Sequence, residues 1–487
     1  MTATKNRRNR LCAAALLLAD ALILAALRAG GHVTLLQLTD RLQISFAVDG
    51  LARCVLPAVM LLYTAVLFYA FSYMEQEEHQ GSFFVFYLLS FGALAAVCLS
   101  ANLATLYLCF EFLTLTSMPL VLHERTKEAV TAGLKYLFYS MGGALMGLLA
   151  VFFVYRYTDG CGTFLAGGFL QDALLAGNEK VFLGVVMAGI LGFGTKAGLY
   201  PMHGWLPAAH PVAPAPASAL LSGIVAKAGV IALIRLVYYA VGPARLAGTW
   251  VQTLWMSLSL LTIFMGSMMA FQEKILKKRL AYSTISQISY ILLALSFLRD
   301  DALAGGLLHL LGHCAAKGCL FLCAGVCVQR LGVRDVRCLK GAGRQIPVTM
   351  ACFAIASLSL VGIPPLAGFT SKWVIGSAAI ASGIPVFRVL APVMLLISAL
   401  LTAGYLFPVV TDAFFPEMPE RPERLENPES PENPAKDPGN ESGSSREGAA
   451  DAASNWSVRL PMLALCMAAL GVGLFGAAFV SLCGFSV

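Results

Sequence analysis

Runs of about 20 consecutive apolar residues recur along almost the whole chain, and this pattern restricts its fold more than any other feature. Each run is long enough to cross the hydrocarbon core of a bilayer as a helix. The runs are continuous and do not alternate with polar residues, which excludes a transmembrane β-barrel. A chain of 487 residues that is 58% hydrophobic and only 13% charged is therefore expected to be an all-α, polytopic membrane protein.

The hydropathy pattern predicts about 13 spans. Segment 31–48 mixes polar and β-branched residues, so a short hairpin outside the bilayer is expected there. The basic start of the chain is interpreted as leading into a retained helix, with a cleaved signal peptide as the alternative. The expected spans are 11–29, 51–74, 83–100, 102–122, 130–155, 180–200, 213–241, 249–271, 280–298, 303–328, 347–383, 387–414 and 457–483.

Basic residues are concentrated in loops that fall on one side of this topology. If each span reverses the side, loops 123–128, 272–279 and 329–344 all lie on the side of the basic N-terminus. The loops on the opposite side carry few lysines or arginines. The positive-inside rule therefore predicts a cytoplasmic N-terminus. The membrane itself is expected to be a bacterial or archaeal plasma membrane.

Two helices are interrupted at corresponding positions, which indicates an internal repeat. One break follows Pro201 and the other lies at Pro364-Pro365, each in a block of five spans. Five spans per block invert the second block, and broken helices in inverted repeats are typical of a transport site. The expected units are 1–82 (N-terminal helices and hairpin), 83–242 and 243–414 (the repeats), 415–456 (a linker) and 457–487 (a C-terminal helix).

Neither the linker nor the cysteines suggest a catalytic module. Segment 415–456 is rich in Pro, Glu, Asn, Ser and Gly, so a disordered acidic cytoplasmic linker is predicted. The 13 cysteines form no Cys-x-x-Cys pair and lie mostly in apolar segments. Cys319, Cys323 and Cys327 share a helix face, and packing is favoured over a cluster site because no fourth ligand has suitable spacing. No cofactor and no metal ion are expected.

Glu111, Lys196 and Lys227 are ionisable residues in strongly apolar segments. A charge at the bilayer centre costs about 2.5–3.5 kcal/mol on insertion scales, so these residues are expected to serve a proton path. Burial favours the neutral amine and a nearby carboxylate favours the charged one, so movement of Glu111 is expected to load or unload Lys196. The alternatives are a packing role for Glu111 and snorkelling of Lys227 to an interface.

His309, His313 and Lys317 are spaced at i, i+4 and i+8, which places them on one helix face. Such a stripe in an apolar helix suits a proton relay. Metal binding by the two histidines is the rival interpretation, and the absence of a neighbouring carboxylate in the sequence makes it the weaker one. One of the two histidines also suits a packing role.

Lys372 follows the second break, where exposed carbonyls and water would let a lysine exchange protons. An interfacial lysine at a helix start is the alternative. His203 and His210 lie in the first broken segment and are further candidates for the path. Asp49 and Arg235 are adequately explained as helix caps or loop anchors.

Several of these stretches together resemble a known family. The chain from about Asp49 to Phe414 resembles the antiporter-like membrane subunits of respiratory complex I (NADH-quinone oxidoreductase). It is similar to the same degree to the D-like subunits of Mrp-type sodium/proton antiporters and to subunits of membrane-bound hydrogenases. The stretches are YLCFEFLTLTS, GFGTKAGLYPMHGWLPAAHPVAPAPASALLSGIVAKAG, KKRLAYSTISQISY, HLLGHCAAKGCLFLCAG and GIPPLAGFTSKW.

The resemblance implies a proton-conducting subunit of a larger complex, built on two inverted five-helix repeats. By position, Glu111 matches the family glutamate, Lys196 and Lys227 the lysines of the first half, and Lys317 the central lysine. Lys372 matches the terminal lysine. Expected partners are other membrane subunits, the lipid bilayer, H⁺ and, as an alternative ion, Na⁺, with no nucleic acid. Redox chemistry is expected only in partner subunits.

Competing functions are separated by what else the complex contains. A cation/proton antiporter of the Mrp type would have no redox partners. A solitary transporter of an organic solute would need polar groups beyond Lys and His, and the spans carry few. A structural subunit that conducts nothing disagrees with the retained ionisable residues. The sequence therefore favours proton translocation within a complex of the complex I or hydrogenase type.

Overall fold

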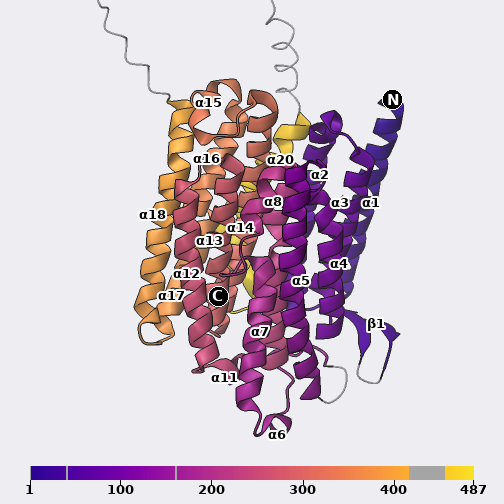
Figure 1. The fold of residues 1–487 in the computed structure, drawn as a ribbon, viewed down its shortest axis with the longest axis vertical. Coiled ribbons are helices and arrows are strands. Elements are labelled where there is room, and N and C mark those ends of the chain that lie inside the picture. The colour runs from indigo at the N-terminus through magenta and orange to yellow at the C-terminus, as the bar shows by residue number, and fades with distance from the viewer. Residues whose placement is uncertain (1, 40–41, 159–161, 416–455) are drawn as a thin grey trace, which may run out of the picture.

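The computed structural model describes residues 2–39, 42–158, 162–415 and 456–487 as a bundle of long helices (Figure 1). The predicted linker lies almost wholly outside the described residues. Eleven described helices are long and apolar enough to cross a membrane. They are α1 (Thr2–Ala29), α2 (Gly50–Tyr73), α3 (Gln80–Leu99), α4 (Leu103–Val121), α5 (Lys127–Arg156), α7 (Glu179–Ala197), the helix from Ala215 to Val241, α12 (Trp250–Gln272), α14 (Asp300–Leu331), α18 (Phe387–Phe414) and α20 (Trp456–Leu482).

The two remaining expected spans are also helical, but neither is a single apolar helix of that length. One is α13 (Leu276–Ser296), which carries many Ser, Thr and Gln side chains. The other is the predicted span 347–383, which is divided into α16 (Pro347–Val361) and α17 (Ala367–Ala381). The polytopic all-α fold is confirmed.

The predicted hairpin is present near the N-terminus. Strands β1 (His32–Gln37) and β2 (Gln43–Ala47) pair antiparallel between α1 and α2. Asp49 then caps α2 through a bond from the Ala52 amide, and its carboxylate also pairs with Arg235. Both residues therefore anchor this end of the bundle, as the sequence suggested.

The two broken helices run in opposite directions. The first consists of α7 and α8 (Leu206–Val212), separated by an irregular segment that starts at Gly198 with φ +82°. Figure 1 places α8 above α7, whereas α17 lies below α16, so the chain passes upward through one break and downward through the other. This arrangement agrees with an inverted repeat.

Two helices form the buried centre. The helix from Ala215 to Val241 comprises α9 (Ala215–Leu220), a π-helical turn η2 (Leu221–Val225), α10 (Lys227–Ile234) and a second π-helical segment η3 (Arg235–Val241). It packs against α14. Both helices are buried on nearly every side and are mainly apolar, as expected for helices that neighbours surround completely.

The connecting segments lie at two opposite ends of the helical bundle. The N-terminus and α15 (Ala342–Gln345), which lies in a predicted basic loop, are at the upper end in Figure 1. The hairpin, α6 (Asp172–Leu175) and α11 (Pro243–Leu246) are at the lower end. The short 3-10 helices η1 (Met74–Gln76) and η4 (Val336–Cys338) complete the described elements.

Candidate functional site

Lys196 lies near the C-terminal end of α7, just before the first break. Its side chain is buried, and Nζ donates a hydrogen bond to Thr114 Oγ1 of α4 at 2.6 Å. The ammonium also lies over the Phe110 ring, 4.6 Å from its centroid. A hydroxyl and an aromatic face both stabilise a cation without supplying a counter-charge.

Glu111 lies on α4 between these two partners of Lys196. It is partly buried, and its Oε1 has no hydrogen-bond partner among the residues that the structure describes. Among the described residues, Glu111 makes no ion pair with Lys196, because the amine is held by Thr114 one turn further along α4. The predicted partners are thus neighbours that do not touch in this arrangement.

Lys227 begins α10 directly after the π-helical turn. It is wholly buried, and its Nζ donates to the carbonyls of Ser222 and Gly223, both at 2.5 Å. A π-helical turn changes the α-helical bonding pattern and is often found at functional sites. The amine therefore ends inside the protein, on carbonyls of its own broken turn.

Lys227 and Lys317 are linked indirectly, because Lys227 bonds to the Ser222 carbonyl whereas the next bond starts at the Ser222 hydroxyl. The hydroxyl of Ser222 shares a bond of 2.6 Å with Thr284 Oγ1 of α13. Thr284 donates to the Leu280 carbonyl at 2.9 Å, and Lys317 Nζ donates to the same carbonyl at 3.0 Å. Two buried lysines on different helices are thus joined through neutral oxygens.

The stripe on α14 continues from Lys317 through His313 to His309. The two imidazole rings are stacked with centroids 6.0 Å apart, so they share the predicted face. His309 Nδ1 bonds to Ser371 Oγ of α17 at 2.9 Å, whereas neither ring nitrogen of His313 has a partner within the described part of the chain. His309 is thereby tied to the second broken helix.

Lys372 lies on α17 beside that contact. Its Nζ donates to the carbonyls of Leu360 and Val361 at 2.6 and 2.9 Å, which are free because α16 ends there. Tyr290 links Lys372 to the stripe: its ring centroid is 5.2 Å from Lys372 Nζ and 5.2 Å from the His309 ring. A mainly apolar cavity of about 380 Å³ opens beside Lys372 between α17 and α18.

The histidines of the first broken segment differ in position. His210 is wholly buried and stacks on Phe321 of α14 at 4.7 Å, and no described residue bonds to either of its ring nitrogens. His203 is only partly buried and stacks on Tyr200 at 5.8 Å. His210 therefore lies in the lysine-rich centre and His203 outside it. The positive charges that act on the His210 imidazole are those of Lys317, Lys277 and Lys227.

The cysteine stripe packs against other cysteines. Cys319 Sγ lies 3.6 Å from Cys466 Sγ of α20 and 3.9 Å from Cys323 Sγ, and both Cys319 and Cys466 approach the Cys352 carbonyl. These thiols are free. In the part of the chain that the structure describes, no group of three or more His, Cys, Asp or Glu is placed to hold a metal ion.

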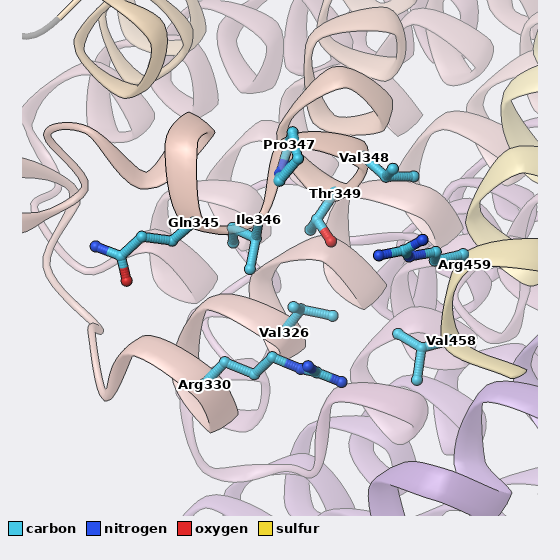
Figure 2. A pocket seen from close by; sticks show the side chains of 9 residues that line it. All are labelled: Val326, Arg330, Gln345, Ile346, Pro347, Val348, Thr349, Val458 and Arg459. Atoms are coloured by element: carbon cyan, nitrogen blue, oxygen red, sulfur yellow. The ribbon is translucent and has the colours of Figure 1, made fainter. Parts of the chain in front are cut away.

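A separate small cavity lies where the upper ends of α14, α16 and α20 meet. Figure 2 shows Arg330, Thr349 and Arg459 among its lining side chains, and its volume is about 30 Å³. No predicted relay residue lines it.

Sequence reasoning missed the neutral partners of the lysines and histidines. Thr114, Ser222, Thr284, Tyr290 and Ser371 stand within the conspicuous stretches, but hydroxyl residues are common in apolar helices. The one available signal was KKRLAYSTISQISY, an unusually polar stretch for a predicted span.

Comparison with protein families gives two matches, which together cover most of the helical bundle. A model described as "NADH:quinone oxidoreductase/Mrp antiporter, TM" matches residues 100–400, more than half of the chain. A second, described as "NADH-Ubiquinone oxidoreductase (complex I), chain 5 N-terminus", matches residues 37–84. The chain belongs to the NADH:quinone oxidoreductase/Mrp antiporter family. The first match includes Glu111 and the four lysines predicted to form the relay.

Members of this family include subunits of different complexes. The chain is 34% identical over 374 residues to NADH-quinone oxidoreductase subunit N of Desulforudis audaxviator, covering 76% of this chain and 73% of that protein. Hydrogenase-4 component B of Escherichia coli is 30% identical, covering 68% and 50% respectively. An Na⁺/H⁺ antiporter subunit of Alkalihalophilus pseudofirmus is 32% identical, covering 67% and 41%. The chain thus spans half or less of the last two.

Solved structures share the fold. The Mrp complex from Dietzia sp. contains a chain with a TM-score of 0.79 and 23% identity, covering 99% of this chain and 92% of that one. Respiratory complex I from Thermus thermophilus contains one with a TM-score of 0.70 and 21% identity, covering 98% and 94%. Both are subunits of multi-subunit membrane assemblies.

Proposed function

We propose that this family member is a proton-translocating, antiporter-like subunit of a multi-subunit energy-converting membrane complex. The observation that carries the proposal is the row of basic residues that begins at the wholly buried Lys227 and ends at the half-buried Lys372. Neutral oxygens and aromatic rings connect its members across four helices.

The first half of the path depends on Glu111 and Lys196. With Lys196 bonded to Thr114, Glu111 of the same helix offers a carboxylate oxygen that has no hydrogen-bond partner among the described residues. A shift of the amine toward Glu111 would hold its proton, and a return to neutral partners would release it. A charge change in a neighbouring subunit that moves Glu111 would thus drive proton loading.

The second half passes the proton across the centre. Lys227 and Lys317 share the Ser222–Thr284–Leu280 connection, and the His313–His309 stack leads to Ser371 and Lys372. Imidazoles can both accept and donate protons, which suits the positions between two lysines. His210 borders this centre as a further member.

The surface beside Lys372 suits a neighbouring membrane subunit. Trp373, Ile380 and Leu396 are exposed around the cavity between α17 and α18. The similar solved chains belong to assemblies of several subunits. We therefore propose that a partner subunit or lipid covers this face.

We also propose that the N-terminus lies on the cytoplasmic side of a prokaryotic plasma membrane, because the basic loops lie at the same end of the bundle as the N-terminus.

A cation/proton antiporter without redox partners is the second candidate. It is supported by the 0.79 TM-score to a chain of an Mrp complex and by the similarity to a protein named as part of an Na⁺/H⁺ antiporter. Flux that requires sodium and needs no electron donor would favour it over the first proposal.

The test is proton flux by the assembled complex in proteoliposomes with an internal pH-sensitive dye. Lys196→Ala should abolish coupled flux, because it removes the buried amine beside Glu111. Lys180→Ala is the matched control, since Lys180 is an exposed lysine on the same helix. Wild-type flux in the Lys196 variant would contradict the proposal.

A further inference from the structure

The small cavity at the upper ends of α14, α16 and α20 brings two arginines together. Arg330 belongs to the last turn of α14 and Arg459 to the start of α20, and both line the cavity (Figure 2). The positive charge of Arg459 acts on Arg330. None of the lining residues that the structure describes is acidic. Like charges in one small cavity repel each other, so this arrangement favours an anion beside the two guanidinium groups.

The first turn of α16 adds polar groups to the same cavity. This helix begins at Pro347, and Pro347 and Thr349 both line the cavity. The first amides of a helix have no acceptor within the helix, and its N-terminus carries a partial positive charge. The cavity volume of about 30 Å³ exceeds the roughly 10–15 Å³ that one water molecule needs. The cavity therefore suits a compact anionic group such as a phosphate, which guanidinium groups and helix N-termini both bind.

Exposed apolar side chains continue from the cavity along α20. Trp456, Leu460, Leu463 and Met467 are spaced at i, i+4, i+7 and i+11, so they share one face of the helix, and each is at least 37% exposed. Tryptophan at the end of a membrane helix is typical of the headgroup level of the bilayer. Leu463 follows Arg459 by four residues, so an apolar side chain lies one turn deeper than the guanidinium group.

The exposed face of α16 has the same order of groups. Val348 lines the cavity, and the exposed Ala351 and Ile355 follow it at i+3 and i+7. A free phosphate ion would contact only the charged cavity and would leave both apolar faces uncovered. A molecule with an anionic head and a hydrocarbon tail would cover the cavity and the faces together.

We propose that this cavity binds the phosphate of an anionic phospholipid, whose acyl chains lie on the exposed faces of α20 and α16. Basic pockets between transmembrane helices on the cytoplasmic side attract such headgroups, and the basic loops lie at this end of the bundle. One phosphate would connect α20 to α14, the helix that carries Lys317. The binding is non-covalent and involves no residue of the proposed relay, so it is independent of the proposed function.

Trp456 is a local reporter for a lipid at this position, because bromine atoms on an acyl chain quench a neighbouring indole. The assembled complex in detergent is titrated with phosphatidylglycerol brominated on its acyl chains, and with brominated phosphatidylcholine as the net-neutral comparison. The signal of Trp456 is the difference between wild type and Trp456→Phe. We expect half-maximal quenching at an about tenfold lower concentration of phosphatidylglycerol, a ratio equivalent to about 1.4 kcal/mol.

The arginines of the cavity should determine this preference. In Arg330→Gln combined with Arg459→Gln, the two lipids should quench Trp456 equally. Arg344→Gln is the matched control, because Arg344 is an exposed arginine of α15 that does not line the cavity. Arg459→Lys keeps the charge and should keep the preference, with weaker binding because the bidentate geometry is lost.

Three results would overturn the lipid site. The first is equal quenching of wild type by the two lipids, which is also the result expected if the acidic segment 416–455 occupied the cavity. The second is an unchanged preference in the double arginine variant. The third is full recovery of Trp456 fluorescence by inorganic phosphate at the concentration of the lipid, which would assign the cavity to a free anion. Proton flux does not enter this measurement, so its failure leaves the proposed function untouched.

Discussion

The buried lysine amines share one kind of environment at the scale of single residues. Lys196 bonds to a hydroxyl, and Lys227, Lys317 and Lys372 bond to backbone carbonyls. Neutral oxygens compensate part of the lost hydration but supply no counter-charge. The charged and neutral forms are therefore closer in energy than they would be in a strong buried ion pair, which suits groups that must exchange protons.

The hydrogen bond from Lys196 to the Thr114 hydroxyl is expected to affect the rate of proton flux. Thr114→Val keeps the shape of the side chain but removes the oxygen that accepts from Nζ, which costs about 1–3 kcal/mol when a buried donor is left unpaired. We expect slower proton flux in vesicles. Thr114→Ser keeps an acceptor and should remain near the wild-type rate; equal rates in the two variants would argue against this contact.

A pH effect on stability is expected at Glu77, which lies in a loop outside the spans. Burial and the nearby Glu124 carboxylate raise the pKa of Glu77 above its ordinary value. The native state thus binds the proton more tightly than the unfolded state, and stability falls as pH rises from about 4.5, the ordinary range of a glutamate. Glu77→Gln removes this penalty.

The Glu77→Gln complex should therefore have a higher Tm than wild type at neutral pH, and the difference should shrink as the pH falls toward the ordinary glutamate range. Glu78→Gln is the control, because its side chain is 95% exposed in the same loop. A Tm difference that stays constant across this pH range would contradict the assignment.

At the scale of helices, close crossings hold the relay in place. A Cβ at Gly229 of α10 would lie 2.5 Å from the Phe193 carbonyl and 2.8 Å from the Ala197 amide of α7. The helix of Lys227 thus contacts the helix of Lys196 backbone to backbone. Only a glycine permits this approach.

Gly229→Ala should separate α10 from α7 and destabilise the protein by about 1–3 kcal/mol, the usual effect of overpacking. The readouts are the Tm and the yield of assembled complex. Gly184→Ala on α7 is the control, since a Cβ there meets nothing within 4 Å. Similar Tm values for both variants would show that the crossing tolerates a methyl group.

How much the sequence could predict also differs between elements. The long apolar helices and both breaks were predictable, because hydropathy and proline act locally. The π-helical turns at Leu221–Val225 and Arg235–Val241 were not, because hydropathy does not distinguish a π-helical from an α-helical turn. The same holds for Thr114 and Tyr290, whose roles depend on which helices become neighbours.

At the scale of the whole molecule, two oppositely directed broken helices flank one buried centre. Lys196 lies at the first break and Lys372 at the second, while α14 carries the stripe between them. This explains how ionisable residues distant in the sequence come together along the proposed path. The boundaries of the two repeats remain predictions from the sequence.

The most direct test of this account is proton flux by the assembled complex carrying Lys317→Ala. Lys317 is wholly buried at the point where the two halves meet, so its loss should interrupt transport whichever half loads first. Lys340→Ala, in the basic loop before α15, controls for loss of a lysine. The account predicts no coupled flux for Lys317→Ala in vesicles that assemble and seal like wild type, and full flux in that variant would contradict it.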